Sequence, residues 1–124
     1  MVDHAEKNYQ RGQWAEQLAL DYLVQKKLEL LSCNYRGPRG EIDLIMLDHE
    51  TIVFIEVRYR ANNNYLHVLE TINEKKCIRI IKTSQQYLQN SRWSSKKPCR
   101  FDIITITGEY DNPEIMWIKN AFQA

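Results

Sequence analysis

The stretch from residue 40 to residue 60 constrains the fold most, because it holds two apolar runs separated by a short polar turn. Ile, Val, Leu and Phe fill residues 41–47 and 51–59, as expected for two largely buried β-strands. His49 and Glu50 lie between the runs, and a two-residue loop at this point joins them as an antiparallel hairpin. The sequence therefore predicts a hairpin near the middle of the chain.

Charged residues interrupt both runs of this hairpin. With a two-residue loop, the register places Asp43 opposite Glu56 and Glu41 opposite Arg58. Because side chains alternate between the faces of a strand, all these charges project from one face. Carboxylates directly opposite each other lie about 5 Å apart and repel, and burial adds to the cost. A divalent cation between Asp43 and Glu56 would remove the conflict, and Mg²⁺ or Mn²⁺ suits carboxylate oxygens.

Each of these pairs has a second interpretation. Asp43 and Glu56 also fit an antiparallel sheet with one solvated face, where neither residue binds a metal. Glu41 and Arg58 also fit an ordinary cross-strand ion pair, in which Arg58 has no catalytic role. The hairpin by itself leaves both alternatives open.

These residues carry a resemblance to known proteins. Asp43 followed by Glu56, Val57 and Arg58 resembles the D…(E/D)-x-K signature of the restriction-endonuclease-like superfamily. More closely, the chain resembles the YraN family of uncharacterised bacterial proteins, from its first helix to its C-terminus. The matching segments are Gly-Glu-Ile-Asp-Leu-Ile at 40–45, Val-Phe-Ile-Glu-Val-Arg-Tyr-Arg at 53–60, Arg-Phe-Asp at 100–102 and Trp-Ile-Lys-Asn-Ala-Phe at 117–122.

The resemblance implies a metal-dependent nuclease-like protein, similar to the archaeal Holliday-junction resolvases, that hydrolyses phosphodiester bonds in nucleic acid, with branched DNA as one expected substrate. It implies Asp43, Glu56 and Arg58 as catalytic residues. It implies Mg²⁺ or Mn²⁺ as the cofactor, held by the carboxylates of Asp43, Glu56 and Glu16 and by the carbonyl of Val57. It also implies nucleic acid as the partner, DNA rather than RNA, and suggests a homodimer, because the resolvases work as dimers.

Arg58 departs from the signature, which has Lys at this position. A lysine can shift its pKa and activate water, whereas an arginine stays protonated and cannot act as a general base. Arg58 can still bind a phosphate bidentately and stabilise charge in a transition state. One reading is a metal-dependent endonuclease, and the alternative is a non-catalytic nucleic-acid-binding protein with a degenerate site. A structural or adaptor role is a third reading, in which Asp43 and Glu56 face solvent.

Periodicity predicts the remaining elements. An amphipathic helix is expected over residues 10–27, where Glu16 borders the apolar face and is either exposed or directed at the metal. Thr71 and Glu74 form a capping box for a second helix over residues 72–90. Its apolar stripe is Ile78, Ile81, Gln85 and Leu88. With strands at 28–35, 100–107 and 114–118, the expected fold is one α/β domain over residues 1–124, with a restriction-endonuclease-like αβββαβ core and a mixed central sheet flanked by helices.

The net charge of +1 does not indicate a nucleic-acid-binding protein, so binding would depend on a local basic patch. The residues assigned to nucleic-acid binding are Arg36, Arg39, Arg60, Lys75, Lys76 and Arg79, and Lys96, Lys97 and Arg100 form a further basic group. Each also fits an ordinary surface charge. Asp102 interrupts a predicted strand and is expected to be structural. Tyr65 and His67 follow a run of asparagines in a predicted loop, where contact with a nucleotide is the less favoured reading.

The composition is that of a globular protein, with 44% hydrophobic and 27% charged residues. No apolar run approaches the ~20 residues of a membrane span, and the polar N-terminal stretch is not a signal peptide. A cytoplasmic location is therefore expected. Cys33, Cys77 and Cys99 lack the spacing of a zinc site, so they are expected to be reduced thiols.

Overall fold

The computed structural model describes residues 4–61, 70–91 and 97–124. Within these ranges the elements are α1 (His4–Gln25), β1 (Glu29–Gly37), β2 (Gly40–Asp48), β3 (Thr51–Arg60), α3 (Glu74–Gln89), β4 (Cys99–Glu109) and β5 (Asn112–Phe122). Every predicted helix and strand is present. Most are longer than predicted, above all α1, which begins before residue 10, and β5, which continues past residue 118, where it keeps pairing with β4.

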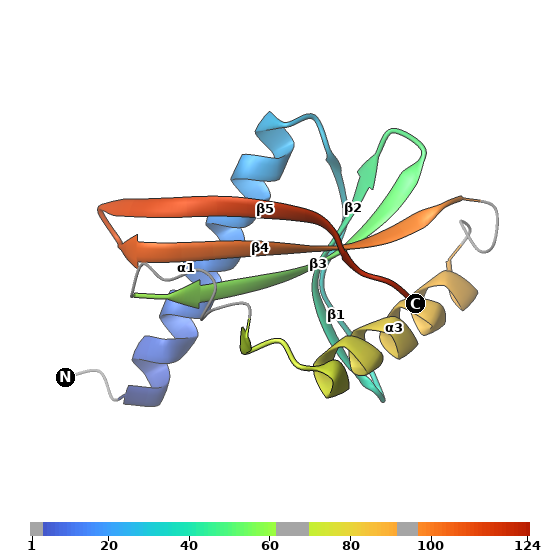
Figure 1. The fold of residues 1–124 in the computed structure, drawn as a ribbon, viewed down its shortest axis with the longest axis horizontal. Helices are drawn as coiled ribbons and strands as arrows, with labels where there is room; N and C mark the ends of the chain where they lie inside the picture. Colours follow the sequence, from blue (N-terminus) through green and yellow to red (C-terminus); the bar gives the residue numbers. More distant parts are fainter. Residues whose placement is uncertain (1–3, 62–69, 92–96) are drawn as a thin grey trace.

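The strands form one sheet in the order β1-β2-β3-β4-β5 (Figure 1). Neighbouring strands are antiparallel except β3 and β4, which are parallel. Parallel neighbours need a crossover connection, and the segment that contains α3 makes this one. The predicted αβββαβ core, a mixed sheet flanked by helices, is therefore confirmed.

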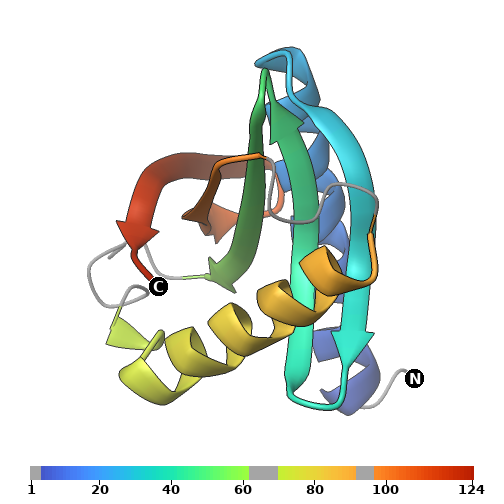
Figure 2. The same ribbon diagram turned by 90° about the vertical axis from the view of Figure 1, so that its right-hand side faces the viewer.

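The two helices cover opposite faces of the sheet (Figures 1 and 2). On one face, Ala15 and Leu23 of α1 pack in a buried cluster with Val53 of β3, as the periodicity of the helix predicted. On the other face, Ile80 of α3 packs with Phe54. Since Val53 and Phe54 are consecutive, β3 is covered on both sides, which explains its continuous apolar run. Among the described residues, neither helix has the length and apolar character needed to cross a bilayer.

The N-terminus of α3 corrects the predicted capping box. Asn73, not Thr71, is the N-cap, and its Oδ1 accepts a hydrogen bond from the Lys76 amide at 2.9 Å. Asn is as good an N-cap as Thr, and the helix that follows begins at Glu74. The sequence pattern was compatible with either residue as the N-cap.

The buried face of α3 also differs from the predicted stripe. Ile78 is 43% exposed, whereas Ile80, Thr83 and Ser84 are buried. The hydroxyls of Thr83 and Ser84 donate to carbonyls of their own helix, at 2.8 Å to Arg79 and 2.6 Å to Ile81. Small polar residues can therefore face the sheet without losing hydrogen bonds, and a search for apolar residues alone missed this face. Ile81 and Leu88 are half-buried at its border.

The β2–β3 hairpin has the predicted register, and its strands separate at one end. His49 adopts a positive φ of 54° in the two-residue loop, and the ladder runs from there to the pair Leu44–Ile55, where it stops. Beyond this pair, β2 stays with β1 as far as Gly40, and β3 stays with β4 as far as Arg60. The strands therefore diverge (Figure 2). We call the opening between residues 40–43 and 56–60 the fork.

Asp102 anchors the other side of the sheet. It is fully buried, and its carboxylate accepts hydrogen bonds from Arg100 Nε at 3.1 Å, Trp117 Nε1 at 2.9 Å and the Asn120 amide at 2.8 Å. Arg100 also donates to Asp48 at 2.8 Å. Asp102 thus has the structural role expected for it, and Arg100 is committed to this network rather than to a basic patch.

Replacing Asp102 with Ala is expected to lower the free energy of unfolding by about 3 kcal/mol, because Arg100 and Trp117 would keep their burial and lose their partner. Urea denaturation followed by tryptophan fluorescence measures the change. Asp21→Ala, on the exposed side of α1, is the matched control and should change stability by less than about 0.5 kcal/mol. Equal effects of the two substitutions would contradict the role of this network.

Candidate metal site

Asp43 lies at the point where the fork opens. Its Oδ2 accepts a hydrogen bond from the Val57 amide at 2.8 Å. Because the β2–β3 ladder has ended at Leu44–Ile55, this amide no longer has a backbone partner on β2, and the carboxylate takes that place. The carboxyl groups of Asp43 and Glu56 are also within hydrogen-bonding reach of each other, as the predicted register required.

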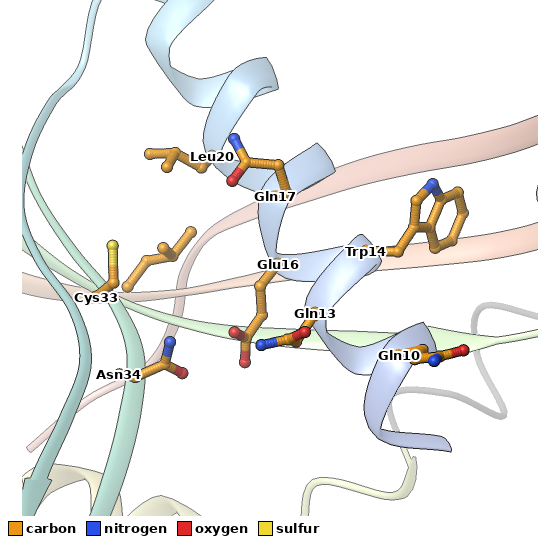
Figure 3. Close-up of a pocket in the computed structure, with 9 residues that line it drawn as sticks. Gln10, Gln13, Trp14, Glu16, Gln17, Leu20, Cys33 and Asn34 are labelled. Carbon is orange, nitrogen blue, oxygen red and sulfur yellow. The ribbon is translucent and has the colours of Figure 1, made fainter. Parts of the chain in front are cut away.

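Two further carboxylates join Asp43, one from α1 and one from its own strand, β2. One oxygen each from Glu16, Glu41 and Asp43 lie within 4.8 Å of one another. Figure 3 shows the Glu16 side chain extending from α1 toward Asn34 on β1. With its amide nitrogen turned to the carboxylates, Asn34 lies 3.1 Å from Glu16 Oε2 and 3.0 Å from Glu41 Oε1. Asn34 therefore holds two acidic side chains beside the third.

Glu56 contacts the opposite side of the fork, where α3 begins. It is only 5% exposed, and its Oε2 lies 3.3 Å from Lys76 Nζ and 3.8 Å from Arg58 Nη2. These are ion pairs without hydrogen-bond geometry, since Oε2 makes no hydrogen bond to the described part of the chain. Burial raises the pKa of Glu56 to about 8, with a smaller contribution from Asp43, while the two cations oppose the rise.

The cluster holds more acid groups than it can ionise without a counter-charge. Burial raises the pKa of Asp43 and of Glu16 above their ordinary values, in each case partly offset by hydrogen bonds. Closely spaced carboxylate oxygens, one of them buried without a hydrogen bond, form the donor set that Mg²⁺ and Mn²⁺ prefer. The residues present therefore fit such a cation. The Val57 carbonyl leaves β3 on the same edge as its amide and so also faces the fork.

The fork opens into a cleft of about 500 Å³ that combines acidic and basic side chains. The charged residues that line it are Arg11, Glu16, Asp43, Glu56, Arg58, Arg60 and Lys76. An arrangement of this kind can bind a cation at the carboxylates and an anion at the adjacent basic groups. Cys33 and Cys99 are exposed and Cys77 half-buried, and all three are free thiols outside this lining, as expected.

Of the two interpretations of Glu41 and Arg58, the cross-strand ion pair does not form between these residues. Glu41 instead pairs with Arg36, its neighbour on β1, at 3.6 Å, and Arg58 pairs with Glu56 of its own strand. The divergence of the strands is the reason, because it carries Glu41 and Arg58 apart. Lys76 was assigned to nucleic-acid binding, yet it turns inward to Glu56.

The other predicted basic residues fall into separate places. Arg60 lines the cleft, whereas Lys75 and Arg79 are exposed on α3 and Arg39 is exposed in the β1–β2 turn. Arg39 and Lys82 border the same shallow hollow between that turn and α3. Lys97 pairs with Glu50 at 2.7 Å, so its expected basic group with Arg100 does not form a patch. Tyr65, His67 and Lys96 lie outside the described residues.

The structure adds Glu41, Asn34 and Arg11 to the site. Glu41 stands two residues before Asp43 and so shares its face, a signal that the predicted pairing with Arg58 obscured. Arg11 stands four residues before Ala15, and both line the cleft. Residues four apart share a face of a helix, so helical periodicity could have found Arg11. No sequence pattern pointed to Asn34, because it reaches the carboxylates from a position on β1 where the backbone has a positive φ of 51°.

In metal-free buffer, Glu56→Gln is expected to stabilise the protein, by an amount that grows between pH 5 and pH 8. The folded state keeps a proton on Glu56 up to about pH 8, whereas the unfolded chain releases it near its ordinary value of 4.5. The folded state thus binds more protons in this window, and wild-type stability falls as the pH rises through it. Gln mimics the protonated acid and escapes this loss, for a gain of about 4 kcal/mol at pH 8.

Urea denaturation at a series of pH values in EDTA measures this difference. Glu114→Gln, at an exposed position of β5, is the matched control and should follow the wild-type profile. A stability difference between Glu56→Gln and wild type that does not vary with pH would contradict the buried, protonated state of Glu56.

Known proteins similar to this chain match nearly its whole length. A family model described as "Uncharacterised protein family UPF0102" matches residues 15–106. A UPF0102 protein of Nitrosococcus oceani is 45% identical over 113 residues, 91% of each chain. Those of Stutzerimonas stutzeri and Legionella pneumophila are 43% and 45% identical, covering 91% and 93% of this chain and 94% and 96% of the relative. The chain therefore belongs to the uncharacterised protein family UPF0102, as its resemblance to the YraN family predicted.

Proposed function

We propose that this protein is a divalent-metal-dependent nuclease that hydrolyses phosphodiester bonds in DNA. The observation that carries the proposal is the convergence of Glu16, Glu41 and Asp43, whose oxygens lie within 4.8 Å of one another, beside a cleft that Arg58 also lines. Carboxylates alone repel a nucleic acid, and basic residues alone bind it without cutting. The two together suit metal-assisted hydrolysis of a phosphodiester.

The carboxylates of Glu16, Glu41 and Asp43 would hold the cation, with Glu56 and the Val57 carbonyl on its β3 side. A divalent cation at this place supplies a Lewis acid for the phosphate and lowers the pKa of a bound water. The protein prepares the site in advance, because Asn34 and the Val57 amide already fix the carboxylates through hydrogen bonds. Fixed ligands reduce the reorganisation that binding and reaction require.

Arg58 would hold the phosphate. Its side chain is 21% exposed, and its buried Nε has no hydrogen-bond partner among the described residues. A guanidinium with an unused donor can bind a phosphate oxygen and stabilise the charge that develops on it. In the reaction, a water oxygen bonds to phosphorus, one ester P–O bond breaks, and the proton released by the water ends on the departing alcohol through solvent.

The exposed basic residues would follow the nucleic-acid backbone away from the cleft. Lys75 and Arg79 lie on the exposed side of α3, Arg60 lies at the cleft and Arg39 lies in the β1–β2 turn. Because the cleft and the N-terminal turn of α3 share Lys76, a bound strand can contact both without a long gap. Phosphate contacts of this kind give affinity without base specificity.

A second candidate function is binding of nucleic acid without cleavage. The observation that favours it is Arg58 itself, which pairs with Glu56 at 3.8 Å and, as an arginine, cannot take a proton from water. The same cleft would then bind a phosphate through Arg58 and Arg60. Both functions predict binding, and only the nuclease predicts a metal-dependent product.

Asp43→Asn is expected to lower the rate of metal-dependent cleavage by at least ~100-fold, because the amide keeps the hydrogen bond from Val57 and loses the charge that a cation needs. The measurement is a gel assay with labelled four-way junction, linear duplex and single strand, each with Mg²⁺, Mn²⁺ or EDTA. Asp21→Asn, outside the cleft, should cut at the wild-type rate. Cutting that is lost only in Asp43→Asn then does not come from a contaminating nuclease. Equal cutting by wild type and Asp43→Asn would exclude this site, and a band shift without cutting would favour the second function.

The double variant Lys75→Met/Arg79→Met is expected to bind DNA more weakly and with a smaller dependence on salt. Each lost phosphate contact reduces the slope of log affinity against log salt by about 1. Fluorescence anisotropy with a labelled duplex in Ca²⁺, over a range of NaCl concentrations, measures both values. Lys119→Met on β5 removes a charge elsewhere and should leave the slope unchanged. Identical slopes for wild type and the double variant would remove α3 from the proposed interface.

A further inference from the structure

Lys76 differs from the other basic residues of α3, because it points into the cleft. Lys75, Arg79 and Lys82 are exposed, whereas the Lys76 side chain is 30% exposed and lines the cleft together with Asp43. Its Nζ lies 3.3 Å from Glu56 Oε2, closer than the 3.8 Å of Arg58 Nη2 to the same oxygen. Lys76 is therefore the nearer cation to this carboxylate.

The helix fixes Lys76 at a position where a cation is not favoured. Its amide donates to Asn73 Oδ1 at 2.9 Å, which sets the backbone in the first turn of α3. The N-terminus of a helix carries a partial positive charge, so a lysine there opposes the dipole, whereas Glu74 in the same turn suits it. Helix stability therefore does not account for a lysine at this place.

Lys76 and Arg58 approach Glu56 from different elements and have different chemistry. An ammonium group is a compact charge with three rotatable N–H donors, whereas a guanidinium presents a rigid planar fork. Lys76 Nζ lies 3.3 Å from Glu56 Oε2 without hydrogen-bond geometry, so its N–H donors can turn to a phosphate oxygen or a water in the cleft. Because alternate residues of β3 share a face, a lysine at position 58 would bring its ammonium to the same side of the strand as Glu56, next to that of Lys76.

We infer that Lys76 is a catalytic residue of this site, whose ammonium group contacts Glu56 and donates to a non-bridging oxygen of the scissile phosphate. This inference rests on the proposed nuclease function. The group acts as a charged donor throughout and transfers no proton. Its interaction strengthens as negative charge builds on the phosphate, so its loss reduces the rate of the chemical step more than it reduces affinity.

The test compares single-turnover cleavage, at saturating protein in Mn²⁺, for wild type, Lys76→Met, Lys76→Met/Arg58→Lys and Lys119→Met. Met keeps the length of the side chain and removes the charge. We expect Lys76→Met to cut at least ~100-fold more slowly, and the double variant to recover at least ~10-fold by returning an ammonium to the cleft from β3. Lys119→Met, on β5, should cut at the wild-type rate.

Two further measurements separate catalysis from folding and binding. Urea denaturation checks that Lys76→Met is folded, and Lys76→Gln, which also removes the charge, serves in its place if it is not. Anisotropy in Ca²⁺ should show DNA affinity within about threefold of wild type for Lys76→Met. An affinity loss as large as the rate loss would make Lys76 a binding contact and overturn its catalytic role.

The outcomes for the two proposals are distinct. The nuclease function fails if wild type does not cut, or if Asp43→Asn cuts as wild type does. The role of Lys76 then fails with it. If wild type cuts and Lys76→Met cuts at the same rate, only the role of Lys76 is overturned. Slow cutting by Lys76→Met without recovery in the double variant would also overturn it if Arg58→Lys alone cuts at the wild-type rate, because the defect would then not be a missing ammonium group.

Discussion

The separation of β2 from β3 is the constraint on which the rest of this structure depends. β3 is held to β4 by a parallel ladder that continues to its last residue, Arg60, while β2 is held to β1 as far as Gly40. The ladder between these two halves of the sheet ends at Leu44–Ile55, and β2 and β3 separate beyond it. The Val57 amide, which has no backbone partner on β2 beyond this point, donates its hydrogen bond to the Asp43 carboxylate.

The fork also explains why acidic groups are tolerated in an apolar sheet. Glu16 reaches it from α1 on one face, and Lys76 reaches it from α3 on the other, so the two helices contribute opposite charges to one place. Burial favours the protonated form of Glu56, and the neighbouring cations Lys76 and Arg58 favour its ionised form. A balance of this kind is sensitive to any added cation or phosphate, because either would shift the protonation of Glu56.

Residues that resemble those of the YraN family divide into two physical roles. Asp43 and Glu56 line the cleft. Arg100, Asp102, Trp117 and Asn120 form a hydrogen-bonded network with Asp48 at the other end of the hairpin. This network joins β4 and β5 to the hairpin end of β2, opposite the fork.

The sequence by itself determined the elements, the hairpin register and the meeting of Asp43 with Glu56, because alternation along strands and a two-residue loop are local properties. The helical period also placed Glu16 at the border of the apolar face of α1. Tertiary structure decided what local patterns do not contain. Because the strands diverge, Glu41 pairs with Arg36 and not with Arg58. Asn73 is the N-cap of α3, and Lys76 of the same helix points inward to Glu56. These outcomes depend on how separate elements meet in space, which periodicity within one element does not specify.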